Sequence, residues 1–130
     1  MLIDLDRFRR VNDEIGRLDG DRALRHVVAV LSQGMHERES LVRLGGEEFV
    51  ALLHCPLGTA WERMEQLRRM LWDEPFQPGR GLDPQRISFS AGIAAWPQDG
   101  DDLSGLLGTA DRRLQACKQQ GGNRVMARDP

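Results

Sequence analysis

The sequence Arg-Leu-Gly-Gly-Glu-Glu-Phe at residues 43–49 lies between two apolar runs, at residues 41–42 and 49–53. Apolar segments on both sides of a Gly-Gly pair predict a β-hairpin, because a two-residue turn needs positive φ angles that glycine adopts at little cost. Gly45 and Gly46 carry no side chain, so the phosphates of a ligand can approach the backbone there. The hairpin is therefore also a candidate ligand site.

Two carboxylates, Glu47 and Glu48, follow the glycines directly. Like charges beside a turn repel each other, and a bound divalent metal ion removes that repulsion. A second acidic pair, Asp4 and Asp6, lies on one face of a strand predicted over residues 1–6. Asp4 is either an exposed residue at the end of a strand or a metal ligand.

A short amphipathic helix is predicted from Phe8 onward, and Gly16 should end it. Asp21 is a plausible N-cap of a second helix, whose apolar stripe is formed by Leu24, Val27, Val28 and Leu31. The side chains of Asn12 and Asp21 could read the edge of a guanine, whose N1–H and exocyclic NH₂ both donate hydrogen bonds. The simpler interpretation is a turn-forming Asn and a helix-capping Asp.

Downstream of the hairpin, an apolar stripe predicts a helix that begins after residues 56–58, and glycines and prolines at 75–84 predict a long loop. Alternating residues from Arg86 to Trp96 predict a half-buried strand. A helix from about Leu103 should end at Gly121-Gly122, before a last short strand. Lys118, near the end of that helix, is either a cation favoured by the helix dipole or a ligand-binding residue.

The composition indicates one ordinary globular domain of 130 residues, with 40% apolar and 29% charged residues. A net charge of −2 gives no support for a nucleic-acid groove or a membrane-surface patch. Cys55 and Cys117 lack metal-ligand spacing and are expected to be reduced core residues of a cytoplasmic protein. No apolar run approaches the roughly 20 residues of a membrane span.

The chain resembles the GGDEF family, the bacterial diguanylate cyclases. The hairpin matches the family signature, and residues 4–21 match the motif D-x-D-x-F-K-x-x-N-D-x-x-G-H-x-x-G-D, with Arg9 and Arg17 replacing its Lys and His. Residues 90–94 are similar to its S-x-G-I-A strand, and residues 110–125 to its A-D-x-A-L-Y-x-A-K-x-x-G-R-N-R-V segment. The resemblance covers nearly the whole chain. Family domains begin earlier, so residues 1–130 are expected to be a single domain without the N-terminal helix and the start of the first strand.

This resemblance implies an α/β (α+β) fold, a ferredoxin-like sandwich akin to nucleotide cyclases and polymerase palms, with a central, mostly antiparallel sheet and flanking helices. It implies that two GTP molecules are condensed into cyclic di-GMP, with release of two pyrophosphates, in a two-fold homodimer. The implied cofactor is Mg²⁺ or Mn²⁺, two ions at each GTP site. An N-terminal sensor or input domain is expected in the parent protein, with neither nucleic-acid binding nor membrane contact by this domain.

The resemblance also assigns roles to individual residues. Asp4, the Leu5 carbonyl and Glu47 are the implied metal ligands, and Glu47, with Glu48 as runner-up, is the candidate to assist deprotonation of the attacking hydroxyl. Asn12 and Asp21 would bind the guanine, with Leu24 packed on the base. The residues expected to face the phosphates are Phe8, Arg9, Gly45, Gly46 and Lys118.

Three departures from the family pattern bear on function. Gly122 replaces an Arg that, in the family, helps to hold the terminal phosphates, and Gln115 replaces a Tyr. His36 and Glu39 stand where an inhibitory product-binding R-x-x-D motif would have its Arg and Asp, so product inhibition through that site is expected to be lost. The alternatives to a cyclase are an inactive GTP-binding regulatory domain and a structural or dimerisation module.

Overall fold

The computed structural model describes all 130 residues as a five-stranded sheet with three helices. The strand order is β2-β3-β1-β4-β5, in which only the β4–β5 pair is parallel. The predicted α/β sandwich with a mostly antiparallel sheet is confirmed. In chain order the elements are β1 (Leu2–Leu5), α1 (Phe8–Gln33), β2 (Ser40–Gly45), β3 (Glu48–Leu52), α2 (Leu57–Asp73), β4 (Phe89–Gly92), α3 (Leu103–Gln119) and β5 (Arg124–Met126).

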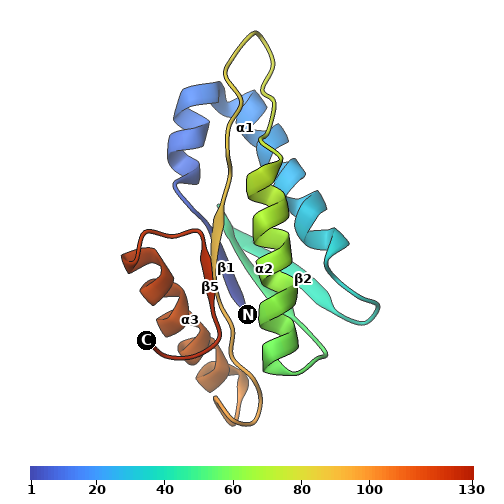
Figure 1. The fold of residues 1–130 in the computed structure, drawn as a ribbon, viewed down its shortest axis with the longest axis vertical. Coiled ribbons are helices and arrows are strands. Elements are labelled where there is room, and N and C mark those ends of the chain that lie inside the picture. Colours follow the sequence, from blue (N-terminus) through green and yellow to red (C-terminus); the bar gives the residue numbers. More distant parts are fainter.

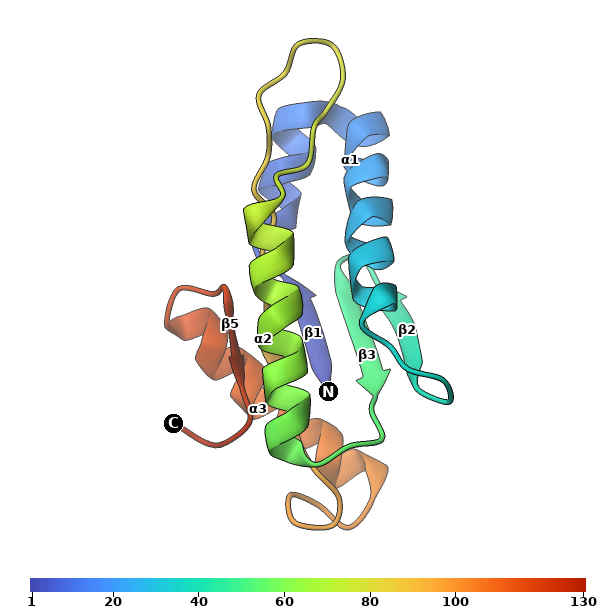
Figure 2. The same cartoon turned by 45° about the vertical axis from the view of Figure 1, so that its right-hand side comes forward.

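The helices lie on both faces of the sheet. Figures 1 and 2 show α1 and α2 side by side along one face, with α3 beside β4 and β5 at the lower end of the molecule. β1 lies at the centre of the sheet, between β3 and β4. This position places Asp4 of β1, and Asp6 just beyond its end, between the hairpin on one side and α3 on the other.

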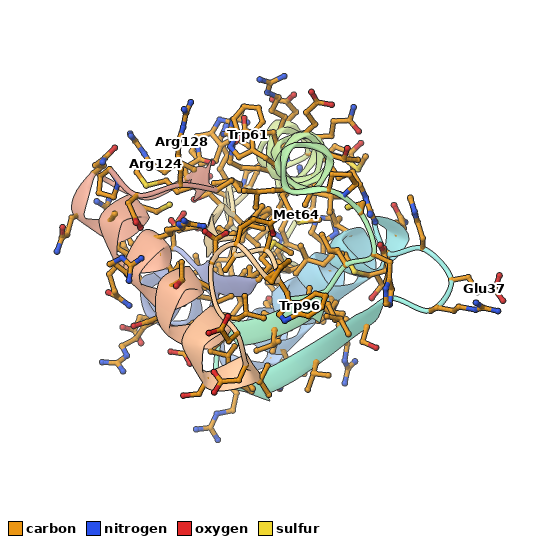
Figure 3. All side chains as sticks on the ribbon, turned by 90° about the horizontal axis from the view of Figure 1, so that it is seen from below. Glu37, Trp61, Met64, Trp96, Arg124 and Arg128 are labelled. Atoms are coloured by element: carbon orange, nitrogen blue, oxygen red, sulfur yellow. The ribbon has the colours of Figure 1, made fainter.

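The main core fills the space between the sheet and the pair α1 and α2. Ile3 and Leu5 of β1 are each 1% exposed, and Phe49 of β3 and Phe89 of β4 are equally buried. Met64 reaches this core from α2 and lies in the interior in Figure 3. Burying one such side chain stabilises the fold by about 1.5–3 kcal/mol. The alternation predicted for the first strand, with apolar residues on one face and aspartates on the other, is therefore confirmed.

α1 is broken at Gly16, as the sequence predicts. Gly16 has φ 86° and ψ 166°, outside the helical region, although the helix is otherwise continuous from Phe8 to Gln33. The two parts of α1 run up and then down in Figure 2, so the break reverses the chain. The prediction that Asp21 caps the second helix is wrong, because helical structure resumes directly after Gly16 and Asp21 lies inside α1.

The hairpin turn lies one residue later than predicted. Gly45 ends β2, and the turn residues are Gly46 and Glu47. Both glycines have positive φ angles, 151° and 50°, and a Cβ at either position would meet nothing within 4 Å. A register shift between Arg43 and Gly45 accommodates the displaced turn. The bare backbone predicted for this turn is therefore present.

β4 is shorter and more deeply buried than the half-buried strand predicted for residues 86–96. It covers only Phe89–Gly92, and all four residues are buried. The face expected to contact solvent is covered by α3, which approaches so closely that a Cβ on Gly92 would lie 1.9 Å from the carbonyl oxygen of Ala110. The serines of this face, Ser88 and Ser90, therefore need hydrogen-bond partners inside the protein.

The other half of that sheet face, over β2 and β3, is open. Its apolar side chains Val42, Leu44 and Leu52 are 54–59% exposed. The two cysteines are free, Cys117 buried and Cys55 half-buried against the core. None of the helices is both long enough and apolar enough to span a bilayer.

Candidate active site

The polar face of β1 meets the end of α3 at a single ammonium group. Lys118 Nζ lies 3.1 Å from Asp6 Oδ1, 3.3 Å from Asp4 Oδ2 and 3.4 Å from the carbonyl oxygen of Leu5. The side chains of Asp4, Asp6 and Lys118 are 22%, 11% and 27% exposed. Opposite charges at these distances and in partial burial hold the three groups together.

Asp6 is the most extensively bonded residue of this cluster. Its carboxylate accepts hydrogen bonds of 2.7 Å from the hydroxyls of Ser88 and Ser90 and from the backbone N–H of Asn123, in addition to that from Lys118. These donors come from the segment leading into β4, from β4 itself, from the turn before β5 and from α3. Asp6 thus joins four parts of the chain and supplies the partners that the buried serines require.

The two glutamates of the hairpin lie beside β1. Glu48 is the cross-strand partner of Asp4, and the Leu5 N–H donates a 3.1 Å hydrogen bond to the carbonyl oxygen of Glu47. Carboxylates directly opposite each other on neighbouring strands repel unless a cation compensates them. The hairpin therefore adds two acidic residues to Asp4 and Asp6.

These oxygens suit a hard divalent cation. Asp4 Oδ1 is buried and has no hydrogen-bond partner, while Asp4 Oδ2 and the Leu5 carbonyl already surround a cation, the Lys118 ammonium. No group of three or more His, Cys, Asp and Glu side chains forms a complete protein cage. Mg²⁺ usually takes one or two protein carboxylates and fills its remaining positions with water and phosphate oxygens. The residues present fit such an ion.

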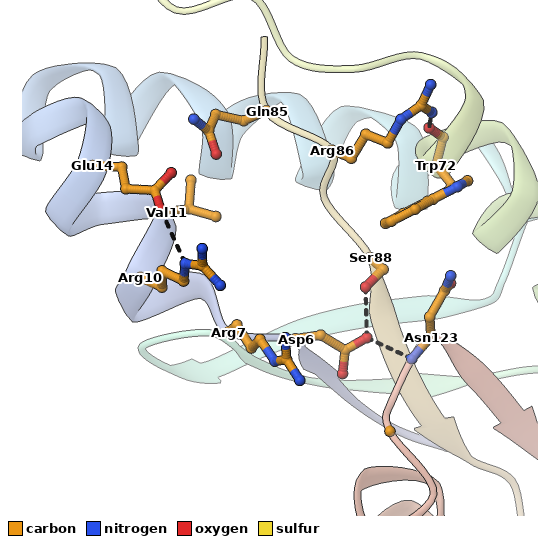
Figure 4. A pocket seen from close by; sticks show the side chains of 11 residues that line it. Asp6, Arg7, Arg10, Val11, Glu14, Trp72, Gln85, Arg86, Ser88 and Asn123 are labelled. Atoms are coloured by element: carbon orange, nitrogen blue, oxygen red, sulfur yellow. Dashed lines mark hydrogen bonds and ion pairs between the residues drawn. The ribbon is translucent and has the colours of Figure 1, made fainter. Parts of the chain in front are cut away.

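Two cavities adjoin the acidic cluster. The smaller, of about 210 Å³, is lined by Asp6, Arg7, Lys118, Gly121 and Gly122. The larger, of about 410 Å³, lies on the other side of Asp6 between the start of α1 and the end of α2. Figure 4 shows its basic side chains Arg7, Arg10 and Arg86, with Arg10 paired to Glu14. Both cavities place guanidinium or ammonium groups where anions would be attracted.

A third cavity lies between α1 and the hairpin. It measures about 490 Å³, and its lining includes Asp21 and Leu24 of α1 and Arg43 of β2. Arg43 also donates a 2.9 Å hydrogen bond to the Gly46 carbonyl, which braces the turn. This cavity contains two of the three residues predicted to bind a guanine.

The third of these residues, Asn12, is brought close to Asp21 by the reversal of α1 at Gly16. Its side chain packs directly on the backbone of Gly20, where a Cβ would lie 1.8 Å from Asn12 Oδ1. Gly20 is therefore needed to leave room for the carboxamide. No hydrogen bond holds this carboxamide in a fixed direction, which leaves its donor and acceptor free for a ligand.

The non-glycine residues predicted to face phosphates lie in three different surroundings. Phe8 is 3% exposed and packs in the main core, so only its backbone N–H, in the first turn of α1, could contact a phosphate. Arg9 is exposed on that first turn, and Lys118 lies in the acidic cluster. A phosphate-binding role for Phe8 is therefore limited to its backbone.

A residue with a side chain does not fit at Gly122 unless the surrounding structure rearranges. Its φ is +77°, and a Cβ there would lie 2.8 Å from Asp6 Oδ1. An arginine at this position would need a different local backbone. The conformation of the turn before β5 therefore suits glycine and not the family's arginine.

Glu39 is a structural residue rather than an exposed ligand. Its carboxylate, 1% exposed, accepts hydrogen bonds from both terminal nitrogens of Arg63 and from the backbone N–H groups of His36 and His54. These bonds from Arg63 hold the pKa of Glu39 well below its ordinary range. The pair ties the segment before β2 to α2, so Glu39 is not available to a product molecule.

Sequence reasoning missed the role of Asp6 and its partners Ser88, Ser90 and Asn123. The alternation Asp4-Leu5-Asp6 was a sufficient signal to place Asp6 beside Asp4. Its partners could not be found in this way, because they lie more than 80 residues away in sequence.

The comparisons with known proteins agree with this geometry. The model of the family described as "Diguanylate cyclase, GGDEF domain" matches residues 1–124. The chain is 33% identical over 124 residues to the uncharacterized protein YhcK of Bacillus subtilis, and 31% identical over 129 residues to the response regulator PleD of Caulobacter vibrioides. These matches cover 95% and 98% of the chain but only 34% and 28% of the relatives, so the chain spans about a third of their length.

Solved structures show the same fold. The active GGEEF domain of a diguanylate cyclase from Vibrio cholerae has a TM-score of 0.83 and 27% identity, covering 95% of this chain and 78% of that one. The GGDEF domain of DgcB from Caulobacter crescentus, in complex with c-di-GMP, has a TM-score of 0.86 and 26% identity, covering 97% and 74%. The chain belongs to the GGDEF family of diguanylate cyclase domains.

Proposed function

We propose that this domain is a Mg²⁺-dependent diguanylate cyclase, which joins two GTP molecules into cyclic di-GMP and releases two pyrophosphates. The observation that carries the proposal is the convergence of Asp4, the Leu5 carbonyl and Lys118 beside the Glu47 turn. Family membership supports the reaction class, and the cavity at Asp21 and Leu24 supports a base-binding role.

Different residues contact the guanine, the phosphates and the reacting 3′-hydroxyl of GTP. Asp21 accepts hydrogen bonds from the guanine edge, the Asn12 carboxamide both accepts and donates, and Leu24 packs on the ring. The turn glycines allow close approach of phosphates, and Arg9 and the Phe8 N–H contact them from the start of α1. Glu47, or Glu48 beside it, accepts the proton of the attacking 3′-hydroxyl.

Asp4, the Leu5 carbonyl and Glu47 would hold Mg²⁺ or Mn²⁺, two ions per GTP with phosphate oxygens completing the coordination. When bound, the ions lower the pKa of the hydroxyl and stabilise charge on the phosphates. Each protein copy binds one GTP, so two copies must face each other across a two-fold axis. We further propose an N-terminal input domain in the parent protein and a cytoplasmic location, where GTP is supplied.

The first experiment is an assay of the purified chain, at high concentration, with GTP and Mg²⁺, followed by chromatography of the nucleotides. We expect cyclic di-GMP from the wild type and a loss of about 10²-fold or more in Glu47→Gln, which keeps the shape but removes a charged ligand. Glu62→Gln, an exposed change on α2, is the matched control and should retain activity. Equal activity in Glu47→Gln would contradict the assigned role.

The second candidate function is an inactive domain that binds GTP and regulates a neighbour. The observation that favours it is Gly122, which replaces the family's phosphate-binding arginine and where a Cβ would lie 2.8 Å from Asp6 Oδ1. Binding of GTP with Mg²⁺ but no product, at concentrations where the chain is dimeric, would select this candidate. Absence of both binding and product would reject both.

A substitution at Gly20 tests the base-binding role separately. In Gly20→Ala the new Cβ would lie 1.8 Å from Asn12 Oδ1, so the carboxamide must leave its present position. We expect GTP binding to weaken by about tenfold, the loss of roughly one hydrogen bond. Gly58→Ala is the control, because its Cβ would meet nothing within 4 Å. Isothermal titration with GTP gives both values, and unchanged affinity in Gly20→Ala would argue against Asn12 as a guanine ligand.

A further inference from the structure

The Lys118 ammonium lies among the same oxygens that are proposed to bind metal. It is within 3.4 Å of Asp4 Oδ2 and the Leu5 carbonyl oxygen, both from β1, and of Asp6 Oδ1 just beyond the end of that strand. Two of these three groups, Asp4 and the Leu5 carbonyl, are the proposed metal ligands. A lysine cannot stay on these oxygens while a divalent ion occupies them, because two cations would then share one acidic site.

The carboxylates of Asp4 and Asp6 need a cation beside them both with and without a bound metal ion. Asp4 and Asp6 are largely buried, and buried carboxylates without a positive partner are strongly unfavourable. Lys118 provides this charge in the ligand-free protein. It does so incompletely, because Asp4 Oδ1 remains buried without a partner.

A cavity beside Lys118 could receive its side chain after displacement. Its side chain is 27% exposed and lines the cavity of about 210 Å³ with Arg7, Gly121 and Gly122. The absence of side chains at Gly121 and Gly122 leaves this exit open. A lysine, as a point charge on a flexible stem, changes partners more readily than an arginine in a fixed bidentate pair.

We infer that Lys118 is an internal placeholder cation, which is displaced from Asp4 and the Leu5 carbonyl when the divalent metal enters and then turns to the phosphates in the adjoining cavity. The inference rests on the proposed function for its metal site. Displacement makes metal binding weak without nucleotide, since the lysine must first be released. It makes metal and nucleotide bind cooperatively, since the phosphates provide the released ammonium with a new partner.

The chain provides a direct test, because Lys118 is the only lysine in the sequence. Acylation by an amine-specific reagent therefore reports on Lys118 and the α-amino group of Met1 alone, and mass spectrometry of peptides separates the two. Met1 is an internal reference, since its ammonium donates to the Ala51 carbonyl rather than to the acidic cluster. Burial lowers the pKa of this α-amino group.

We expect millimolar Mg²⁺ without nucleotide to raise the labelling rate of Lys118 by about fivefold or more, the low end of typical couplings between ligands. The rate of Met1 should not change. In Asp4→Asn the basal rate of Lys118 should rise and the effect of Mg²⁺ should disappear. Circular dichroism verifies that this variant is folded.

A second measurement separates this inference from the proposed function. Mn²⁺ binding, followed by electron paramagnetic resonance without nucleotide, should tighten in Lys118→Met and weaken in Asp4→Asn. Mn²⁺ binding that depends on Asp4 but leaves Lys118 labelling unchanged would overturn the placeholder role and leave the metal site standing. Absence of Asp4-dependent Mn²⁺ binding, even with GTP present, would overturn both.

Discussion

Replacing Glu39 by alanine is expected to lower the free energy of unfolding by about 3–5 kcal/mol, the range for breaking one partner out of a buried ion pair. The Arg63 guanidinium, 14% exposed, would lose both of its hydrogen bonds to the carboxylate. The N–H groups of His36 and His54 would lose their acceptor as well. Urea unfolding followed by circular dichroism measures the change.

Glu37→Ala is the matched control for this prediction. Glu37 is exposed, and Figure 3 shows it on a loop that projects away from the body of the protein. Its replacement should change stability by less than about 0.5 kcal/mol, as is usual for surface sites. A loss at Glu39 no larger than at Glu37 would show that the Arg63 pair does not stabilise the fold.

The same pair makes stability depend on pH in a defined direction. Hydrogen bonds from Arg63 hold the pKa of Glu39 far below its ordinary value of 4.5. A carboxyl group with a lowered pKa in the folded state contributes stability that is fully present above the unfolded pKa and is lost as the pH falls below it. The wild type should therefore lose stability below about pH 4.5, and Glu39→Gln should lose less over the same interval.

The second large effect is expected for Asp6→Ala. Its carboxylate is the acceptor for the Ser88 and Ser90 hydroxyls and the Asn123 N–H, all at 2.7 Å, and it pairs with Lys118. Each buried donor left without an acceptor costs about 1–3 kcal/mol, so we expect a loss of about 3 kcal/mol or more. Thermal unfolding should show a clearly lower Tm than the wild type.

Asp73→Ala, an exposed change at the end of α2, is the control for the loss of an acidic residue. Because Asp6 also pairs with Lys118, its loss should increase the labelling rate of that lysine even where the chain remains folded. A stable Asp6→Ala protein with unchanged Lys118 reactivity would contradict the central position given to Asp6.

Much of the fold followed from local patterns in the sequence. The alternation of Ile3 and Leu5 with Asp4 and Asp6 placed the two faces of β1, and Gly16 marked the break in α1. The family motif then brought Asn12, Asp21 and the hairpin into one hypothesis about a nucleotide site. Grouping these residues into one predicted site needed only the local patterns and the family resemblance.

What sequence reasoning missed depends on contacts between distant segments. Ser88 and Ser90 looked solvent-facing because alternation cannot reveal that α3 covers the second face of β4. Phe8 fitted a phosphate motif, but its side chain also completes the core, and burial decides its orientation. Glu39 looked like a remnant of a binding motif, because nothing in the local sequence indicates that Arg63 lies opposite it.

The central place of β1 has a consequence for how the chain folds. β1 pairs with β3 and with β4, so its partners are formed by residues 48–50 and 89–92. During synthesis at roughly 5–20 residues per second, β1 therefore waits several seconds before its second partner has left the ribosome. Ile3 and Leu5 remain exposed to other chains in that interval. Completion of the sheet, rather than formation of any helix, is expected to limit the folding rate, because loop closure over such distances is slow.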